Sequence, residues 1–277
     1  ERPSGTLLAV DTSTGKFRWQ RRLTDATFSG ASVMGDTLFT ATGDTGSGLR
    51  ARHARSGDTL WTRQFTAYDT LRVVPESDAL LVEGYAGGSS ESVLLRLSPS
   101  DGKTRWQRPT NGRFVVIGGT RDTLIALDSP TSTQPSEVAA VVQLSVSNGK
   151  DLPGRAALKV SPRAVATATA VIDLREDGRL RAVDLISGKE LWAEATGADP
   201  VQGPVLHDGR VYVQTTNGEI VARDAGTGRE IWRSARRRDP QKAVASDPGF
   251  WNTLIVQDGT VYSTSSRGTV FALAPPR

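Results

Sequence analysis

The chain has 277 residues, a formal net charge of +4 and no cysteine. The absence of cysteine excludes disulfides and thiolate sites, and so small a charge at this length does not indicate a nucleic-acid partner. No apolar run is long enough for a transmembrane helix, and the length allows a large core. The class of protein must therefore be inferred from patterns within the chain.

One pattern recurs. Gly5–Trp19 reads GTLLAVDTSTGKFRW, and Gly178–Trp192 and Gly218–Trp232 repeat its glycines, alanine, aspartate and tryptophan at the same spacing. Apolar residues alternate on both sides of a short polar turn, which predicts a β-hairpin. The aspartate can accept hydrogen bonds in the turn, the glycine allows a positive φ, and the tryptophan can seal one sheet against the next. The repeat residues with these structural roles are Asp11, Gly15, Trp19, Gly57, Trp61, Gly102, Trp106, Asp184, Gly188, Trp192, Asp224, Gly228 and Trp232.

The turn glycines recur with a period of about 40–50 residues made only of strands, which predicts an all-β fold, a β-propeller of four-stranded antiparallel blades. We name the strands of a blade A, B, C and D from the axis outward. Residues 1–20 supply C and D, five complete blades run from Thr27 to Trp232, and residues 251–274 supply A, B and C. We favour seven blades, closed by N- and C-terminal strands into a single domain over residues 1–277. Six or eight blades stay open.

The core of the repeat, formed by Ala9, Asp11, Thr14, Gly15 and Trp19, resembles the pyrroloquinoline-quinone-type (PQQ-like) propeller repeat. This repeat occurs in quinoprotein dehydrogenases, in cofactor-free propellers such as the outer-membrane assembly lipoprotein BamB, and in sensor domains of some bacterial kinases. The resemblance covers nearly the whole chain and implies the fold and a location in the periplasm or cell envelope. It does not specify a function.

Propeller geometry sorts the connections onto two faces. Turns between strands A and B, and between C and D, carry many aspartates, which are good turn formers. Arginines follow the D strands and should collect near one channel mouth: Arg21, Arg22, Arg63, Arg108, Arg113, Arg233, Arg236, Arg237 and Arg238. We predict that this basic rim attracts a protein with an acidic surface. The alternative, that these arginines only solvate the ends of loops, stays open.

The long connection over residues 234–250 places Arg236, Arg237 and Arg238 beside Phe250 and Trp251. Arginine and aromatic side chains are favoured at protein-binding hot spots. The predicted partner-binding residues are therefore Arg236, Arg237, Arg238, Phe250, Trp251, Arg21, Arg22, Arg63 and Arg108.

No catalytic constellation is recognisable. His53 and His207 belong to distant repeats and are expected in turns, so neither a histidine triad nor a zinc site is predicted. Quinoprotein dehydrogenases use a vicinal disulfide beside the cofactor, which a chain without cysteine cannot form. We therefore expect no cofactor, no metal and no enzymatic activity.

The leading hypothesis is a binding scaffold of the bacterial envelope, associated with the membrane, if at all, through a lipid anchor or a partner. The alternative is a ligand-binding sensor domain of a larger receptor or kinase, because the chain starts inside one blade and stops before the seventh turn glycine. A quinoprotein dehydrogenase is the least favoured of the three hypotheses.

Overall fold

The computed structural model describes residues 5–11, 14–23, 27–43, 47–86, 91–129, 139–152, 158–216, 218–234, 254–257, 259–264 and 270–275. These residues form strands β1 to β25 and contain no helix. Apart from one parallel contact, the described neighbouring strands pair antiparallel. The prediction of an all-β fold of antiparallel blades is confirmed.

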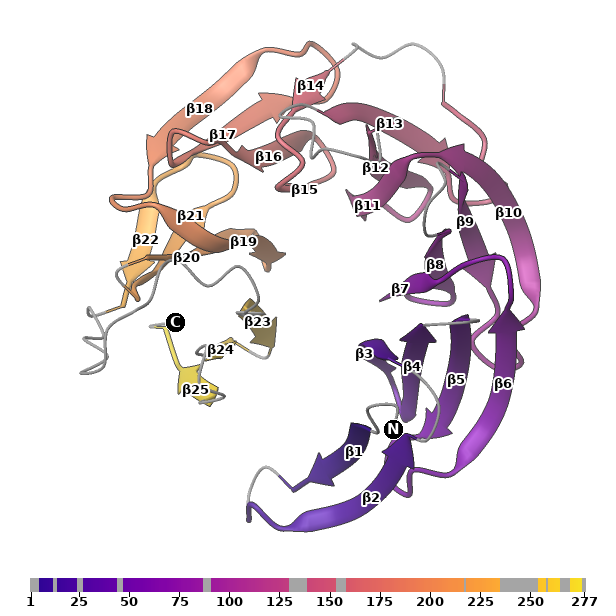
Figure 1. The fold of residues 1–277 in the computed structure, drawn as a ribbon. Helices are drawn as coiled ribbons and strands as arrows, with labels where there is room; N and C mark the ends of the chain where they lie inside the picture. The colour runs from indigo at the N-terminus through magenta and orange to yellow at the C-terminus, as the bar shows by residue number, and fades with distance from the viewer. Residues whose placement is uncertain are drawn as a thin grey trace. The chain divides into compact units, whose positions relative to one another are not determined.

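The first three sheets follow the predicted strand order. A two-stranded sheet contains β1 (Gly5–Val10) and β2 (Phe17–Leu23). The next sheet contains β3 (Thr27–Met34), β4 (Thr37–Gly43), β5 (Ser47–His53) and β6 (Thr59–Phe65). The third contains β7 (Thr70–Pro75), β8 (Leu80–Tyr85), β9 (Glu91–Leu97) and β10 (Thr104–Asn111). In Figure 1 these four strands lie in chain order, with the D strand β10 at one edge.

The next two blades are joined into one eight-stranded sheet. Its strands are β11 (Arg113–Gly119), β12 (Thr123–Ser129), β13 (Ala139–Ser145), β14 (Lys159–Val160), β15 (Ala164–Ala166), β16 (Ala170–Leu174), β17 (Arg179–Asp184) and β18 (Glu190–Ala195). The junction is a single parallel pair between Gly118 and Ala166. A Cβ on Gly118 would lie 2.4 Å from the Ala166 carbonyl oxygen, so glycine is what allows this approach.

The last complete blade contains β19 (Pro200–His207), β20 (Arg210–Thr215), β21 (Ile220–Asp224) and β22 (Glu230–Arg233). A three-stranded sheet follows, with β23 (Leu254–Gln257), β24 (Thr260–Thr264) and β25 (Val270–Leu273). The predicted C and D strands near the N-terminus, five full blades, and A, B and C strands after residue 251 are all present among the described residues.

The chain divides into two compact units, which we describe separately. One contains residues 1–115, 128–135 and 145–151, and the other residues 116–127, 136–144 and 152–277. Apolar side chains of alternating strand positions fill the core of each unit, for example Phe39, Leu49 and Leu80 in the first, and Ile172 and Val211 in the second. The number of blades, their closure and the single domain stay predictions.

The repeat tryptophan of one blade packs on the turn glycine of the next. A Cβ on each glycine would lie only 2.7–2.8 Å from the indole in the four pairs Trp19–Gly57, Trp61–Gly102, Trp106–Gly149 and Trp192–Gly228. Each indole Nε1 also donates a hydrogen bond of 2.8–3.2 Å to a backbone carbonyl of the same turn. The glycine is therefore required twice, for its positive φ and for the space that the indole occupies. The predicted role of the tryptophan in holding the next sheet is confirmed for these pairs.

Two glycines of one unit separate these two requirements. Gly228 (φ 73°) lies against Trp192, whereas Gly209 (φ 70°) has no described atom within 4 Å of an added Cβ. Gly209→Ala should cost only the left-handed backbone strain, about 1–2 kcal/mol. Gly228→Ala should cost about 1–3 kcal/mol more, because the methyl group displaces the indole. Urea unfolding of both variants measures the difference; equal losses would contradict the proposed packing role.

Candidate functional site

Three arginines of the predicted rim lie inside D strands. Arg21, Arg63 and Arg108 each follow the repeat tryptophan by two residues, in β2, β6 and β10. Their placement in the connections after these strands was therefore wrong. The alternation of side chains along a strand puts them on the tryptophan side, toward the following blade.

Each of these guanidinium groups binds the turn that the tryptophan contacts. Arg63 donates to the Gly102 carbonyl oxygen at 2.6 Å, and Arg21 lies 3.0 Å from the Asp58 carboxylate. Arg108 lies 3.1 Å from Asp151 and donates to the Gly149 carbonyl oxygen at 3.3 Å. Partial burial lowers the pKa of Arg63. These arginines therefore tie neighbouring blades together.

The other predicted partner-binding residues divide into two groups. Arg22 is exposed in β2. Arg236, Arg237, Arg238, Phe250 and Trp251 lie outside the described residues. Arg233, also expected on the rim, ends β22 and pairs with Glu219 at 3.1 Å and Glu230 at 2.8 Å. Its hydrogen bond with Glu230 raises the pKa of Arg233.

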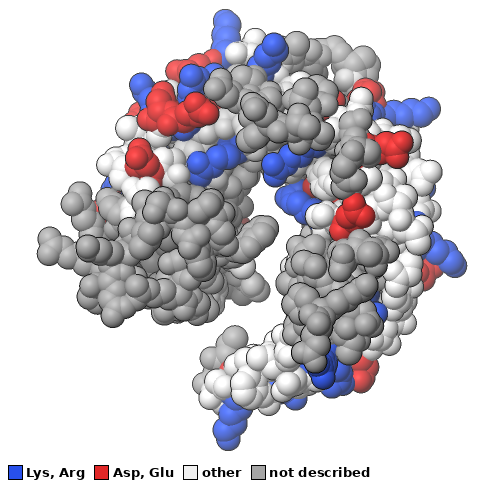
Figure 2. Space-filling model, viewed as in Figure 1, with Lys and Arg blue, Asp and Glu red and all other residues white. Residues whose placement is uncertain are grey.

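A further group of arginines is buried, which sequence reasoning did not detect. Arg52, Arg96 and Arg223 lie in C strands and are 6–8% exposed. Arg52 and Arg223 immediately follow the repeat alanine and donate to the carbonyl oxygen of their own turn glycine. The only signal in the sequence was an arginine between two positions that define the hairpin. Figure 2 accordingly shows basic and acidic side chains interspersed over the described part of the visible face.

The repeat aspartates shape the C–D turns. Asp184 Oδ1 accepts hydrogen bonds from the Ser187 N–H at 2.7 Å and the Ser187 hydroxyl at 2.7 Å. Asp224 makes the equivalent pair with Thr227, both at 2.8 Å. These hydrogen bonds lower the pKa of both aspartates. The predicted turn role of these residues is confirmed.

Neither histidine belongs to a described cluster of chemical groups. His53 accepts a hydrogen bond from the Arg55 N–H at 3.3 Å, and His207 lies 3.3 Å from Asp208. Within the described ranges, no group of three or more histidine, aspartate and glutamate side chains could hold a metal ion. The same part of the chain includes no helix able to cross a membrane.

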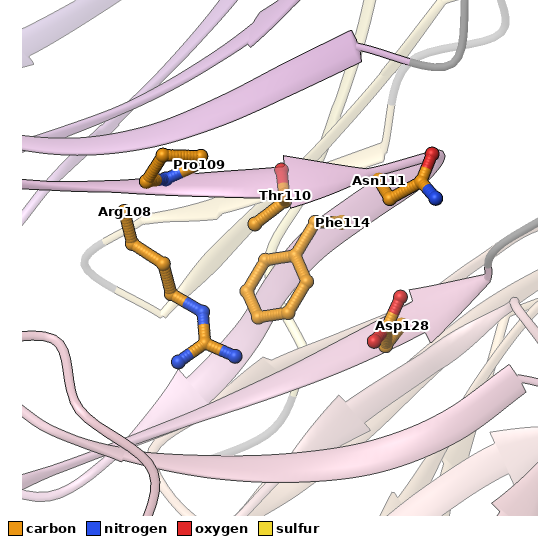
Figure 3. A pocket seen from close by; sticks show the side chains of 6 residues that line it. All are labelled: Arg108, Pro109, Thr110, Asn111, Phe114 and Asp128. Carbon is orange, nitrogen blue, oxygen red and sulfur yellow. The ribbon is translucent and has the colours of Figure 1, made fainter.

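A pocket of about 370 Å³ lies where β10 passes into β11, close to the end of β12. It is lined by Arg108, Pro109, Thr110, Asn111, Phe114 and Asp128. Figure 3 shows the Arg108 guanidinium and the Asp128 carboxylate on either side of the Phe114 ring. Arg108 lies 5.7 Å from the centre of that ring and is already bound to Asp151, so Asp128 is the carboxylate that the pocket offers to a ligand. Burial raises the pKa of Asp128.

Asp128→Asn should stabilise the protein at pH 7. A carboxyl whose pKa is raised in the folded state opposes folding when it is ionised, and the amide removes this penalty. The advantage should be present at neutral pH and disappear below the ordinary pKa of about 3.9, where both states are protonated. Thermal melts from pH 3 to pH 7, with the exposed Asp122→Asn as control, measure it. A pH-independent difference would contradict the assigned cause.

The repeat, the strand order and the tryptophan–glycine contacts define a chain of the PQQ-like β-propeller class. A family model described as "Outer membrane protein assembly factor BamB" matches residues 2–116 and 176–275. This match covers most of the chain, which therefore belongs to that family. The family places it in the bacterial cell envelope, as the resemblance of the repeat implied.

Individual relatives are distant. The chain is 23% identical over 243 residues to BamB of Yersinia pestis, covering 81% of this chain and 58% of that protein. It is 24% identical over 242 residues to BamB of Moranella endobia, covering 80% and 60%. The chain thus spans about three-fifths of the length of these curated relatives.

Solved structures show the same fold. BamB from Moraxella catarrhalis has a TM-score of 0.58 at 20% identity, covering 97% of this chain and 76% of that one. Apo AztD from Citrobacter koseri has a TM-score of 0.59 at 14% identity, covering 98% and 89%. The computationally designed Ika8 protein has 0.61 at 11%, covering 98% and 90%. Because one fold serves such different proteins, these likenesses support the architecture alone.

Proposed function

We propose that the chain is a non-catalytic scaffold that binds a protein partner during outer-membrane protein assembly. The observation that carries this proposal is the match to the BamB family over most of the chain. The blade-to-blade ties support it, because a framework held by tryptophan and arginine at every described turn can present its loops in fixed positions. Seven blades, closed by strands from both ends, belong to the same proposal.

Partner binding is assigned to the connection after β22 and to Arg22. The residues in that connection are Arg236, Arg237, Arg238, Phe250 and Trp251. Arg21, Arg63 and Arg108 contribute less, because their guanidinium groups are already bound to neighbouring turns. A partner with an acidic surface would complement the remaining arginines.

Charge reversal tests this assignment. Arg236→Glu, Arg237→Glu and Arg238→Glu combined should lower capture of the partner from solubilised bacterial envelopes at least about tenfold, with no change in melting temperature. A matched control reverses three exposed cations on described turns and strands, Arg55, Lys103 and Arg121. Equal capture by both triple variants would remove the basic connection from the proposal.

A ligand-binding sensor domain is the second candidate, and the pocket at Phe114 favours it. The pocket is within the size range of small-molecule sites and offers the half-buried carboxylate of Asp128. A screen of small cationic metabolites by thermal shift tests this candidate. A stabilising ligand whose effect is lost in Asp128→Asn would support a sensor, and no stabilisation of the wild type would count against it.

A further inference from the structure

Gly15 differs from the other turn glycines for which the packing is described. It has a φ of 70°, close to the 69–75° of Gly57, Gly102, Gly149 and Gly228. Each of those four lies under the indole of the preceding repeat, whereas a Cβ on Gly15 would meet no described atom within 4 Å. The Gly15 turn therefore has the backbone geometry of an indole seat, and no indole of the described residues occupies it.

The adjoining face of β1 is also uncovered. Val10 is 47% exposed. The equivalent residues of the five later repeats are at most 6% exposed: Arg52, Leu97, Leu144, Val183 and Arg223. Arg223 donates to the Ala195 carbonyl oxygen at 2.7 Å, so this position faces the preceding blade. Leu8, on the same side of β1, is 46% exposed.

Phe17 shows that an ordinary blade would not be a sufficient cover. It lies opposite Val10 in the β1–β2 ladder and is 71% exposed. The equivalent positions of the later repeats are polar and remain exposed even where a preceding blade is docked: Thr59, Thr104, Asp151, Glu190 and Glu230. Another blade of this repeat would thus leave the Phe17 ring in water. An aromatic side chain at this position instead fits a ligand that reaches past the edge of a blade.

We propose that the Gly15 turn, with Leu8, Val10 and Phe17, docks an extended, tryptophan-containing segment of a partner protein. The partner's indole would stack on Gly15 as Trp192 stacks on Gly228, and its flanking apolar residues would contact Val10 and Phe17. Lys16 is exposed beside the seat, so an acidic residue near the tryptophan is favoured. In the Gly228 interface, Glu194 follows the tryptophan by two residues and lies 3.9 Å from Arg223. This inference rests on the proposed role as a protein-binding scaffold and specifies the partner's chemistry.

A peptide that copies residues 187–196, SGKELWAEAT, is a suitable probe. It contains the indole that the chain already places on a turn glycine and the acid two residues later. The probe carries 5-fluorotryptophan, so its ¹⁹F signal is distinct from the six tryptophans of the protein. Titration with the wild-type chain should shift and broaden this signal, and a probe with alanine for tryptophan should not compete. No shift with a folded wild-type chain would overturn the proposal, including the case in which another part of the chain fills the seat.

Two substitutions locate the binding. Gly15→Ala puts a methyl group on the seat and should weaken binding at least about tenfold, and Phe17→Ser should weaken it about fivefold. Gly35→Ala is the matched control, because Gly35 has a φ of 56° and no described atom within 4 Å of an added Cβ, but lies in the β3–β4 turn. It should bind the probe like the wild type. Unchanged binding by Gly15→Ala would overturn the proposed site.

The failure of this site is distinguishable from the failure of the proposed function. If the wild type and Gly15→Ala capture the envelope partner equally, the scaffold role stands and the Gly15 site is wrong. If the fluorinated probe binds at Gly15 but the wild type captures no partner, the site stands and the scaffold role fails. Circular dichroism of each variant verifies that strand content is retained.

Discussion

Trp192→Ala is expected to lower the free energy of unfolding by about 3–5 kcal/mol, the usual loss for a buried aromatic side chain. The Trp192 side chain is 8% exposed and packs with Leu180 and Val211 as well as on Gly228. Its Nε1 also donates to the Ala225 carbonyl oxygen at 3.2 Å. Removal of the indole leaves a cavity between two blades and an unsatisfied carbonyl group.

Two companion variants separate these effects in urea unfolding experiments. Trp192→Phe keeps most of the ring packing and loses the hydrogen bond, so it should cost less than alanine. Leu191→Ala changes a neighbour that is 51% exposed, and should stay within about 0.5 kcal/mol of the wild type. If Trp192→Ala were as mild as Leu191→Ala, the indole would not be what holds the two blades together.

Arg181→Met is expected to destabilise the protein by about 3–5 kcal/mol, because it leaves a buried carboxylate without its counter-charge. Asp173 is 1% exposed and receives Arg181 Nε at 3.0 Å and Nη2 at 2.7 Å. The Ser161 N–H donates to the same carboxylate at 2.9 Å. The hydrogen bonds with Asp173 raise the pKa of Arg181, so this guanidinium stays charged throughout the working range.

A second substitution tests whether the loss comes from the stranded charge. Arg181→Met combined with Asp173→Leu should recover much of the lost stability, because apolar replacement of both partners of a buried pair is often neutral. Arg179→Met, which alters an exposed arginine of the same strand, is the control. A double variant less stable than Arg181→Met would assign the loss to packing rather than to the unpaired carboxylate.

Both predictions concern the same division of labour among charged and aromatic residues. In the described blades, a tryptophan and, in three cases, an arginine two residues later bind the next turn. A side chain held in this way serves the framework, and a partner would have to break its bonds before using it. The residues best placed for recognition are therefore those outside this pattern, such as Phe17 and the connection that follows Trp232.

The local repeat determined most of the architecture. A glycine that needs a positive φ, an aspartate that caps the turn and alternating apolar residues act within one hairpin, so their spacing was enough to predict the strands. The tryptophan followed by the same reasoning, because a side chain of that size in an outer strand must be covered by a neighbour. The BamB-like class followed from the spacing of these residues.

Only the tertiary structure decided what the charged residues do. Arg63 and Arg22 look alike in the sequence, yet one binds the Gly102 carbonyl oxygen in the next blade and the other is exposed. The difference depends on which side of a strand meets a neighbouring blade, a contact between residues about 40 apart. The empty seat at Gly15 was hidden for the same reason: the hairpin is locally complete, and what covers it is contributed by another segment.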